Sequence, residues 1–177
     1  MLEKRNKLNY IIHSALIAAV YVGLTFLSNI FGLAYGPIQF RVSEVLTILP
    51  VFTPAAIPGL TVGCFIANFA SFNILDIIFG TIATLIAAIL TYLLKDIKFK
   101  NIPLLAFAPP IIVNALIIGL EIALFFLPEG FHIYGFLISA IQVGVGQTLV
   151  CYGLGIPFYA IVSKYSIFNS FKPELDV

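Results

Sequence analysis

The sequence has 177 residues, of which 61% are hydrophobic and only 10% charged, and its mean hydropathy is +1.10. This composition excludes a soluble globular domain and is typical of a protein that crosses a membrane several times. With a formal net charge of +1 and no sustained basic stretch, the chain also lacks the positive charge that binding to a nucleic-acid backbone requires, so we expect no nucleic-acid partner.

Six apolar segments separated by Gly, Pro and Asn residues predict a single all-α membrane domain covering residues 1–177. The first segment is too long for the apolar part of a secretory signal and has the length of a membrane span. The second and third are shorter than the roughly 20 residues of a full crossing, so we expect a tilted or partly sunken hairpin there. The expected helices are approximately 10–31, 41–53, 55–71, 74–94, 102–127 and 133–163.

The basic residues that flank these segments predict the orientation in the membrane. Six crossings place three groups of them on one face, and the positive-inside rule assigns that face to the cytoplasm. We therefore expect a protein of the cell membrane with both termini inside and Arg41 outside. The three groups are Lys4, Arg5 and Lys7; Lys95, Lys98 and Lys100; and Lys164 and Lys172.

Polar residues within the apolar segments are the strongest functional signal. An ionised side chain near the bilayer centre costs about 2.5–3.5 kcal/mol even on lenient insertion scales, so it marks an internal site by default. At about 1.5 Å per residue, most of these residues fall in the outer half of the membrane. We predict a site that opens to the exterior and binds a polar, largely uncharged small molecule. Its candidate residues are Gln39, Arg41, Glu44, Asn68, Asp76, Asn114, Glu121 and Gln147.

Each candidate also has a purely structural interpretation. Arg41 and Glu44, three residues apart, could pair with each other at the headgroup level. Asp76 could cap the helix that begins beside it or complement its dipole. The amides could join helices through hydrogen bonds. These amides are Asn68, Asn114, Gln142 and Gln147.

Two pairs of small residues predict close helix approach. Ala15 and Ala19 form a small-xxx-small patch on the first segment, and Gly59 and Gly63 form a GxxxG pair on the third. The spacing does not decide whether the partner helix belongs to this chain or to another.

Catalytic and nucleotide-binding motifs are absent from the sequence. It contains no P-loop, so any ATP-driven activity must borrow its energy from partner subunits. It has no HExxH or GxSxG motif and no cysteine–histidine cluster, and Cys64 and Cys151 lie singly in apolar segments. We therefore expect no enzymatic activity, no metal site and no cofactor in this chain.

Several runs resemble the queuosine-precursor transporter family, whose members are substrate-binding S-components of energy-coupling factor (ECF) transporters. The most specific run is Gln39–Glu44, and similar runs are Asp76–Thr81 and Asn114–Glu121, within a similarity that spans roughly residues 10–163. The resemblance implies a six-helix bundle in which Ala15 and Ala19 contact a transmembrane coupling subunit. It also implies two cytosolic ATPase partners. Gln147 departs from the carboxylate expected at its position.

The resemblance further implies a 7-deazaguanine ligand, a precursor of queuosine. Glu121 or Glu44 could accept the N1 proton and the 2-amino group together, and Asn114 or Arg41 could donate to the 6-oxo group. Asp76 could bind a cationic aminomethyl substituent. Three alternatives remain: an S-component for another vitamin or nucleobase, a non-transporting membrane scaffold, and, least favoured, a membrane enzyme.

Overall fold

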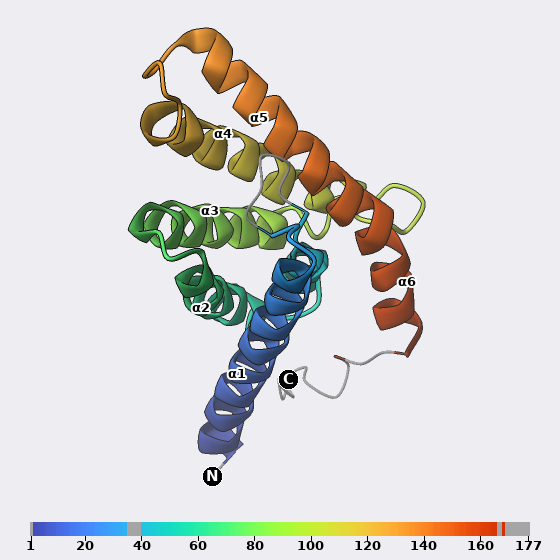
Figure 1. Ribbon diagram of the computed structural model, residues 1–177. Coiled ribbons are helices and arrows are strands. Elements are labelled where there is room, and N and C mark those ends of the chain that lie inside the picture. Colours follow the sequence, from blue (N-terminus) through green and yellow to red (C-terminus); the bar gives the residue numbers. More distant parts are fainter. Residues whose placement is uncertain (1, 35–39, 166–167, 169–177) are drawn as a thin grey trace.

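The computed structural model describes residues 2–34, 40–165 and 168, with side chains from residue 6 onward, and its elements are helical (Figure 1). The all-α prediction is therefore confirmed for the described residues, in which one isolated bridge joins Phe99 and Ile102. The elements are α1 (Leu2–Ile30), η1 (Val42–Val51), α2 (Ala56–Asn68), η2 (Phe69–Ser71), α3 (Ile74–Leu93), η3 (Leu104–Phe107), α4 (Ala108–Phe125), α5 (Ile133–Thr148), η4 (Leu149–Leu154) and α6 (Gly155–Tyr165).

Four helical segments in the described part of the chain are long and apolar enough to cross a membrane. They are Asn6–Ile30, Ile74–Leu93, Leu104–Phe125 and Ile133–Tyr165. The two remaining apolar segments, Val42–Val51 and Ala56–Ser71, are shorter, in agreement with the expected short second and third segments. Of the six expected segments, four therefore have the length of a full crossing.

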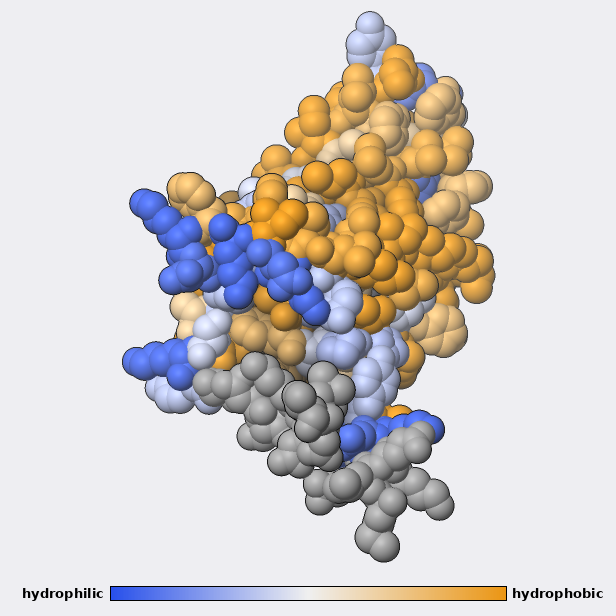
Figure 2. All heavy atoms as spheres, turned by 180° about the vertical axis from the view of Figure 1, so that it is seen from behind, coloured by the Kyte–Doolittle hydropathy of each residue, from blue (hydrophilic) through white to orange (hydrophobic). Residues whose placement is uncertain are grey.

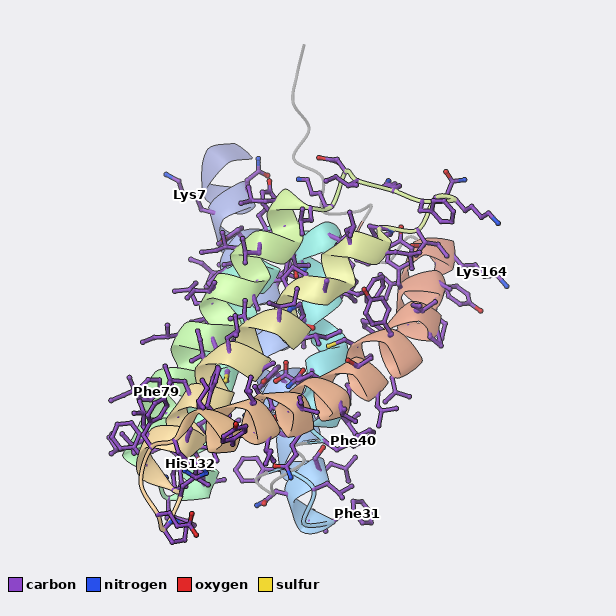
Figure 3. All side chains as sticks on the ribbon, turned by 90° about the horizontal axis from the view of Figure 1, so that it is seen from above. Lys7, Phe31, Phe40, Phe79, His132 and Lys164 are labelled. Atoms are coloured by element: carbon purple, nitrogen blue, oxygen red, sulfur yellow. The ribbon has the colours of Figure 1, made fainter. Side chains whose placement is uncertain are left out.

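The surface has the character of a membrane protein. Hydrophobic residues cover most of the face shown in Figure 2, and the largest hydrophilic groups lie at its left and lower edges. Lys7 and Lys164 lie at one end of the bundle, whereas Phe31, Phe40 and His132 lie at the other (Figure 3). This distribution agrees with the predicted separation of basic residues from the opposite end.

Small residues bring α1 and α2 into close contact. A Cβ atom on Gly59 would lie 2.8 Å from the Ser14 carbonyl oxygen, and one on Gly63 would lie 3.0 Å from that of Ala18. The GxxxG pair therefore packs against α1 of the same chain. Ala15 and Ala19 lie on α1 but remain exposed.

The second segment, expected to be α-helical like the rest, is instead the 3₁₀ helix η1. At its start, the Val42 amide donates to Ser28 Oγ (2.9 Å), and just past its end the Ala55 carbonyl accepts from Ser14 Oγ (2.9 Å). Fourteen residues of α1 separate these two serines, which is about 21 Å at 1.5 Å per residue. The ten residues of η1 cover about 20 Å of this length as a 3₁₀ helix, against about 15 Å as an α-helix, and residues 52–55 lead on to the second contact. The tighter winding lets this short segment accompany α1 over the depth that it must cover.

Three sides of η1 contact three different parts of the fold. Leu46 and Leu49 pack into a core that α1 and α2 share. Ile48 packs with Phe107 and other residues of a second core near η3 and α6. Thr47, on a third side, lies 3.8 Å from the Cys151 sulfur in η4. This central position brings η1 into contact with α2 and α3, which carry Asn68 and Asp76, and with η4.

Candidate functional site

Arg41 joins three parts of the chain at the outer end of the bundle. It immediately precedes η1 in an extended conformation and is 6% exposed. Its Nε donates to the Ala34 carbonyl (2.9 Å) and its Nη1 to Asn68 Oδ1 (3.0 Å). Asn68 Nδ2 in turn donates to the Asp76 carbonyl (2.8 Å). The loop after α1, the end of α2 and the start of α3 are therefore tied together by buried hydrogen bonds.

Glu44, in the first turn of η1, is held by a hydrogen bond from α1. The Tyr21 hydroxyl donates to Glu44 Oε1 at 2.5 Å, and both residues are buried. Glu44 Oε2 is also buried and accepts no hydrogen bond from the described residues. A simple surface ion pair of Arg41 with Glu44, the structural alternative drawn from the sequence, does not describe this arrangement.

Glu121 is a buried carboxyl group that no donor among the described residues satisfies. It is fully buried in the outer half of α4, and neither carboxylate oxygen accepts a hydrogen bond from the described residues. The half-buried Asp76 carboxyl lies within hydrogen-bonding range of Glu121 and could share a proton with it, and the Arg41 guanidinium is close enough to interact with it electrostatically. A buried acceptor without a partner costs about 1–3 kcal/mol, and more when it is charged. An added donor, a cation or a proton shared with Asp76 would satisfy this arrangement.

Two amides complete the candidate set inside the bundle. Asn114, two turns before Glu121 on α4, is 6% exposed, and no hydrogen bond of its side chain is found among the described residues. Gln147, near the end of α5, is 3% exposed and accepts from the Cys151 thiol at 3.6 Å. The neighbouring Gln142 is only half-buried. Asn114 and Gln147 thus keep donor atoms available in the interior.

The last expected helix, 133–163, is interrupted where it passes η1. Residues Leu149–Leu154 form the π-helical segment η4 between α5 and α6. Within it, Cys151 lies near both Thr47 Oγ1 (3.8 Å) and the Glu44 carbonyl (4.0 Å). π-Helical turns are frequent at functional sites because they redirect side chains within a helix.

The elements that carry these residues contact one another in a closed sequence. η1 contacts α3, α3 contacts α4, α4 contacts η4, and η4 contacts η1. Arg41 interacts electrostatically with both Glu44 and Glu121. Among the described candidate residues, Arg41 is the one cation, whereas Glu44, Glu121 and Asp76 are three carboxyl groups. The carboxyl groups therefore outnumber the cation that can balance them.

Three sequence predictions need correction or lie outside the described part. The N-cap of α3 is Asn73, whose side chain accepts from the Leu75 amide (3.0 Å), so the interpretation of Asp76 as the cap is wrong. Asp76 lies in the first turn, where it complements the helix dipole. Gln39 lies outside the described residues. The sequence also places Phe31 beside the first outer loop, where its ring could stack on a flat ligand, and in the structure this side chain is 70% exposed.

Sequence reasoning missed the neighbours that orient the candidates. Tyr21 is fully buried beside Glu44, and Thr25 donates to Ser43 Oγ at 2.7 Å one turn further along α1. A phenol in the middle of an apolar span signals a need for a hydrogen-bond partner, so Tyr21 could have been suspected. Cys151 carries no comparable signal. The described residues contain no group of three or more His, Cys, Asp or Glu residues that could hold a metal ion.

Comparison with known proteins gives one family and one relative. The family model described as QueT transporter matches residues 11–164. A protein of Lactococcus lactis subsp. cremoris (strain MG1363) named queuosine precursor transporter QueT is 43% identical over 98 residues. That alignment covers 55% of this chain and 57% of the relative, so the chain spans little more than half the length of the relative it matches. No solved structure matches the chain.

Proposed function

Because this chain belongs to the QueT transporter family, a family of transporters and not of enzymes, we propose that it is the membrane subunit that binds a queuosine precursor for import. Family membership and the four long apolar helices make it a multi-pass membrane protein. The proposed ligand is a 7-deazaguanine base. The relative named as a queuosine precursor transporter supports this choice.

One observation carries the proposal: the buried carboxylate oxygens that have no partner. Glu44 Oε2 and both oxygens of Glu121 accept no hydrogen bond from the described residues. A scaffold would gain from replacing such groups with apolar ones, because an unpartnered buried charge destabilises the fold. A ligand rich in N–H donors would satisfy them. A 7-deazaguanine offers an N1 proton, a 2-amino group and a pyrrole N–H.

The 6-oxo group of such a base needs a donor, and two residues were candidates. Arg41 already uses Nε and Nη1 for Ala34 and Asn68. Asn114 has no side-chain hydrogen bond among the described residues and lies on the same helix face as Glu121. We assign the 6-oxo contact to Asn114. Arg41 then orders the neighbouring loop and balances the charge of the carboxylates.

Binding to purified protein tests the ligand proposal. The protein in detergent is titrated by calorimetry with the aminomethyl, cyano and free queuine forms, and material bound after purification is identified by mass spectrometry. Glu121→Gln should weaken binding about tenfold or more, the effect of a lost charge-assisted contact. The matched control is Glu129→Gln, which alters an exposed carboxylate between α4 and α5. Equal affinities of the two variants would argue against a site at Glu121.

We further propose that the protein works as an S-component of an ECF transporter. The exposed small residues Ala15 and Ala19 on α1 would contact the coupling subunit, and two partner ATPases would use ATP in the cytoplasm. The position of Lys7 and Lys164 at one end of the bundle supports termini on the cytoplasmic side of the cell membrane (Figure 3). Co-purification with a coupling complex tests this assembly. Ala19→Leu should abolish co-purification and uptake while ligand affinity is unchanged.

A further inference from the structure

The two buried carboxylates differ in how many oxygen atoms remain available. Glu44 Oε1 accepts the Tyr21 hydroxyl at 2.5 Å, which leaves only Oε2 without a partner. Neither oxygen of Glu121 accepts from a fixed donor among the described residues, and the group within hydrogen-bonding range of it is the Asp76 carboxyl, itself an acceptor when ionised. The two residues are therefore unequal as binding groups, although the sequence presents them as equivalent.

The difference matters because a guanine-type edge carries two parallel donors, the N1 proton and one proton of the 2-amino group. A carboxylate meets such a pair through its two oxygens side by side, as it does with an arginine fork. At Glu44 the Tyr21 hydroxyl already occupies one of the two oxygens. At Glu121, which is fully buried, neither of the two oxygens is occupied by a fixed donor of the protein.

On the basis of the proposed function, we propose that Glu121 reads the two-donor edge of the base, whereas Glu44 makes a single contact through Oε2. Tyr21 is then a positioning residue: its hydroxyl fixes the rotamer of Glu44 and directs Oε2 away from α1. Discrimination between bases with and without a 2-amino group resides in Glu121 alone.

The test combines two ligands with two variants. The probes are 7-deazaguanine and 7-deazahypoxanthine, which lacks the 2-amino group, and their affinities are measured by calorimetry on purified protein. In the wild type, loss of the 2-amino group should weaken binding about tenfold. In Glu121→Gln that penalty should shrink to about twofold or less, because the paired contact is already broken. In Glu44→Gln it should remain about tenfold.

A penalty that persists in Glu121→Gln and disappears in Glu44→Gln would overturn the assignment. If neither base binds the wild type, the proposed function itself fails, so the two failures are distinguishable. Should the glutamine variants not fold, the same comparison is made with Glu121→Asp and Glu44→Asp. Shortening should then reduce the 2-amino penalty only at Glu121.

A double-mutant cycle with Glu44 tests the role of Tyr21. Tyr21→Phe should lower the affinity for both bases by the same factor, about three- to tenfold, and leave the 2-amino penalty unchanged. In a Glu44→Gln background the same substitution should have no further effect, because Tyr21 acts through Glu44. Additive losses in the double variant would show that Tyr21 acts by a different route.

Discussion

Asn68 should be the polar residue on which the outer end of the bundle depends most. It is fully buried, accepts from Arg41 Nη1 at 3.0 Å and donates to the Asp76 carbonyl at 2.8 Å. Asn68→Ala removes both bonds and leaves a charged donor and a carbonyl without these partners. A hydrogen bond to a charged group contributes about 1.5–3 kcal/mol, and an orphaned buried acceptor costs about 1–3 kcal/mol.

The expected loss is therefore about 3 kcal/mol or more. On the scale of about 2–4 °C per kcal/mol for soluble domains of 150–250 residues, the melting temperature should fall by about 6–12 °C.

The cysteines provide the assay. The chain has no tryptophan and two cysteines, Cys64 and Cys151, both free and buried. A dye that becomes fluorescent on reaction with thiols therefore reports unfolding during a thermal scan in detergent. Asn29→Ala is the control, since it makes the same substitution at an exposed position near the end of α1. If both variants melted at the same temperature, the reasoning about the Arg41–Asn68–Asp76 connection would be refuted.

Three further predictions concern close contacts and charge. Gly63→Ala should lower the melting temperature, because its Cβ would lie 3.0 Å from a backbone oxygen of α1. The control Gly23→Ala, whose Cβ would meet nothing within 4 Å, should leave the melting temperature equal or raise it. The reverse order of melting temperatures in the thiol assay would contradict the packing of α1 against α2. Gly80→Ala would place a Cβ 2.5 Å from Asn68 Nδ2 and should reproduce part of the loss seen in Asn68→Ala, a result absent if the amide can move aside freely. In calorimetry, Asp76→Asn should weaken binding of the cationic aminomethyl base about tenfold and binding of the neutral cyano base by less than twofold. Equal losses of affinity for the two bases would show that Asp76 does not bind the aminomethyl group.

The burial of the key polar residues could be predicted from the sequence, and their partners could not. Arg41, Glu44, Asn68 and Glu121 interrupt apolar runs, and the cost of such residues in a membrane predicts that they face the interior. Which group meets which depends on the rotation of each helix about its axis and on lateral packing between distant segments. The Tyr21–Glu44 and Arg41–Asn68 bonds join residues 23 and 27 positions apart, beyond the reach of local spacing.

The 3₁₀ winding of the second segment could not be predicted from the sequence either. The run from Val42 to Val51 is apolar and short, which indicates a buried helix but does not distinguish 3.6 residues per turn from three. The tighter form suits the distance between Ser14 and Ser28 on α1, which bears on η1 only once the two helices are paired. The π-helical η4 lies where the last helix meets η1, a contact that local sequence spacing does not reveal.

The threefold winding of η1 has a consequence for how this segment can evolve. Since three residues complete one turn, inserting or deleting a single residue would rotate every later side chain by a third of a turn. The side with Leu46 and Leu49 would then turn away from α1 and α2, and another side would replace it. Substitutions of similar volume can accumulate in η1, but changes in its length are expected only in multiples of three. Deleting one residue after Glu44 should therefore be far more damaging than replacing any apolar residue in the same stretch.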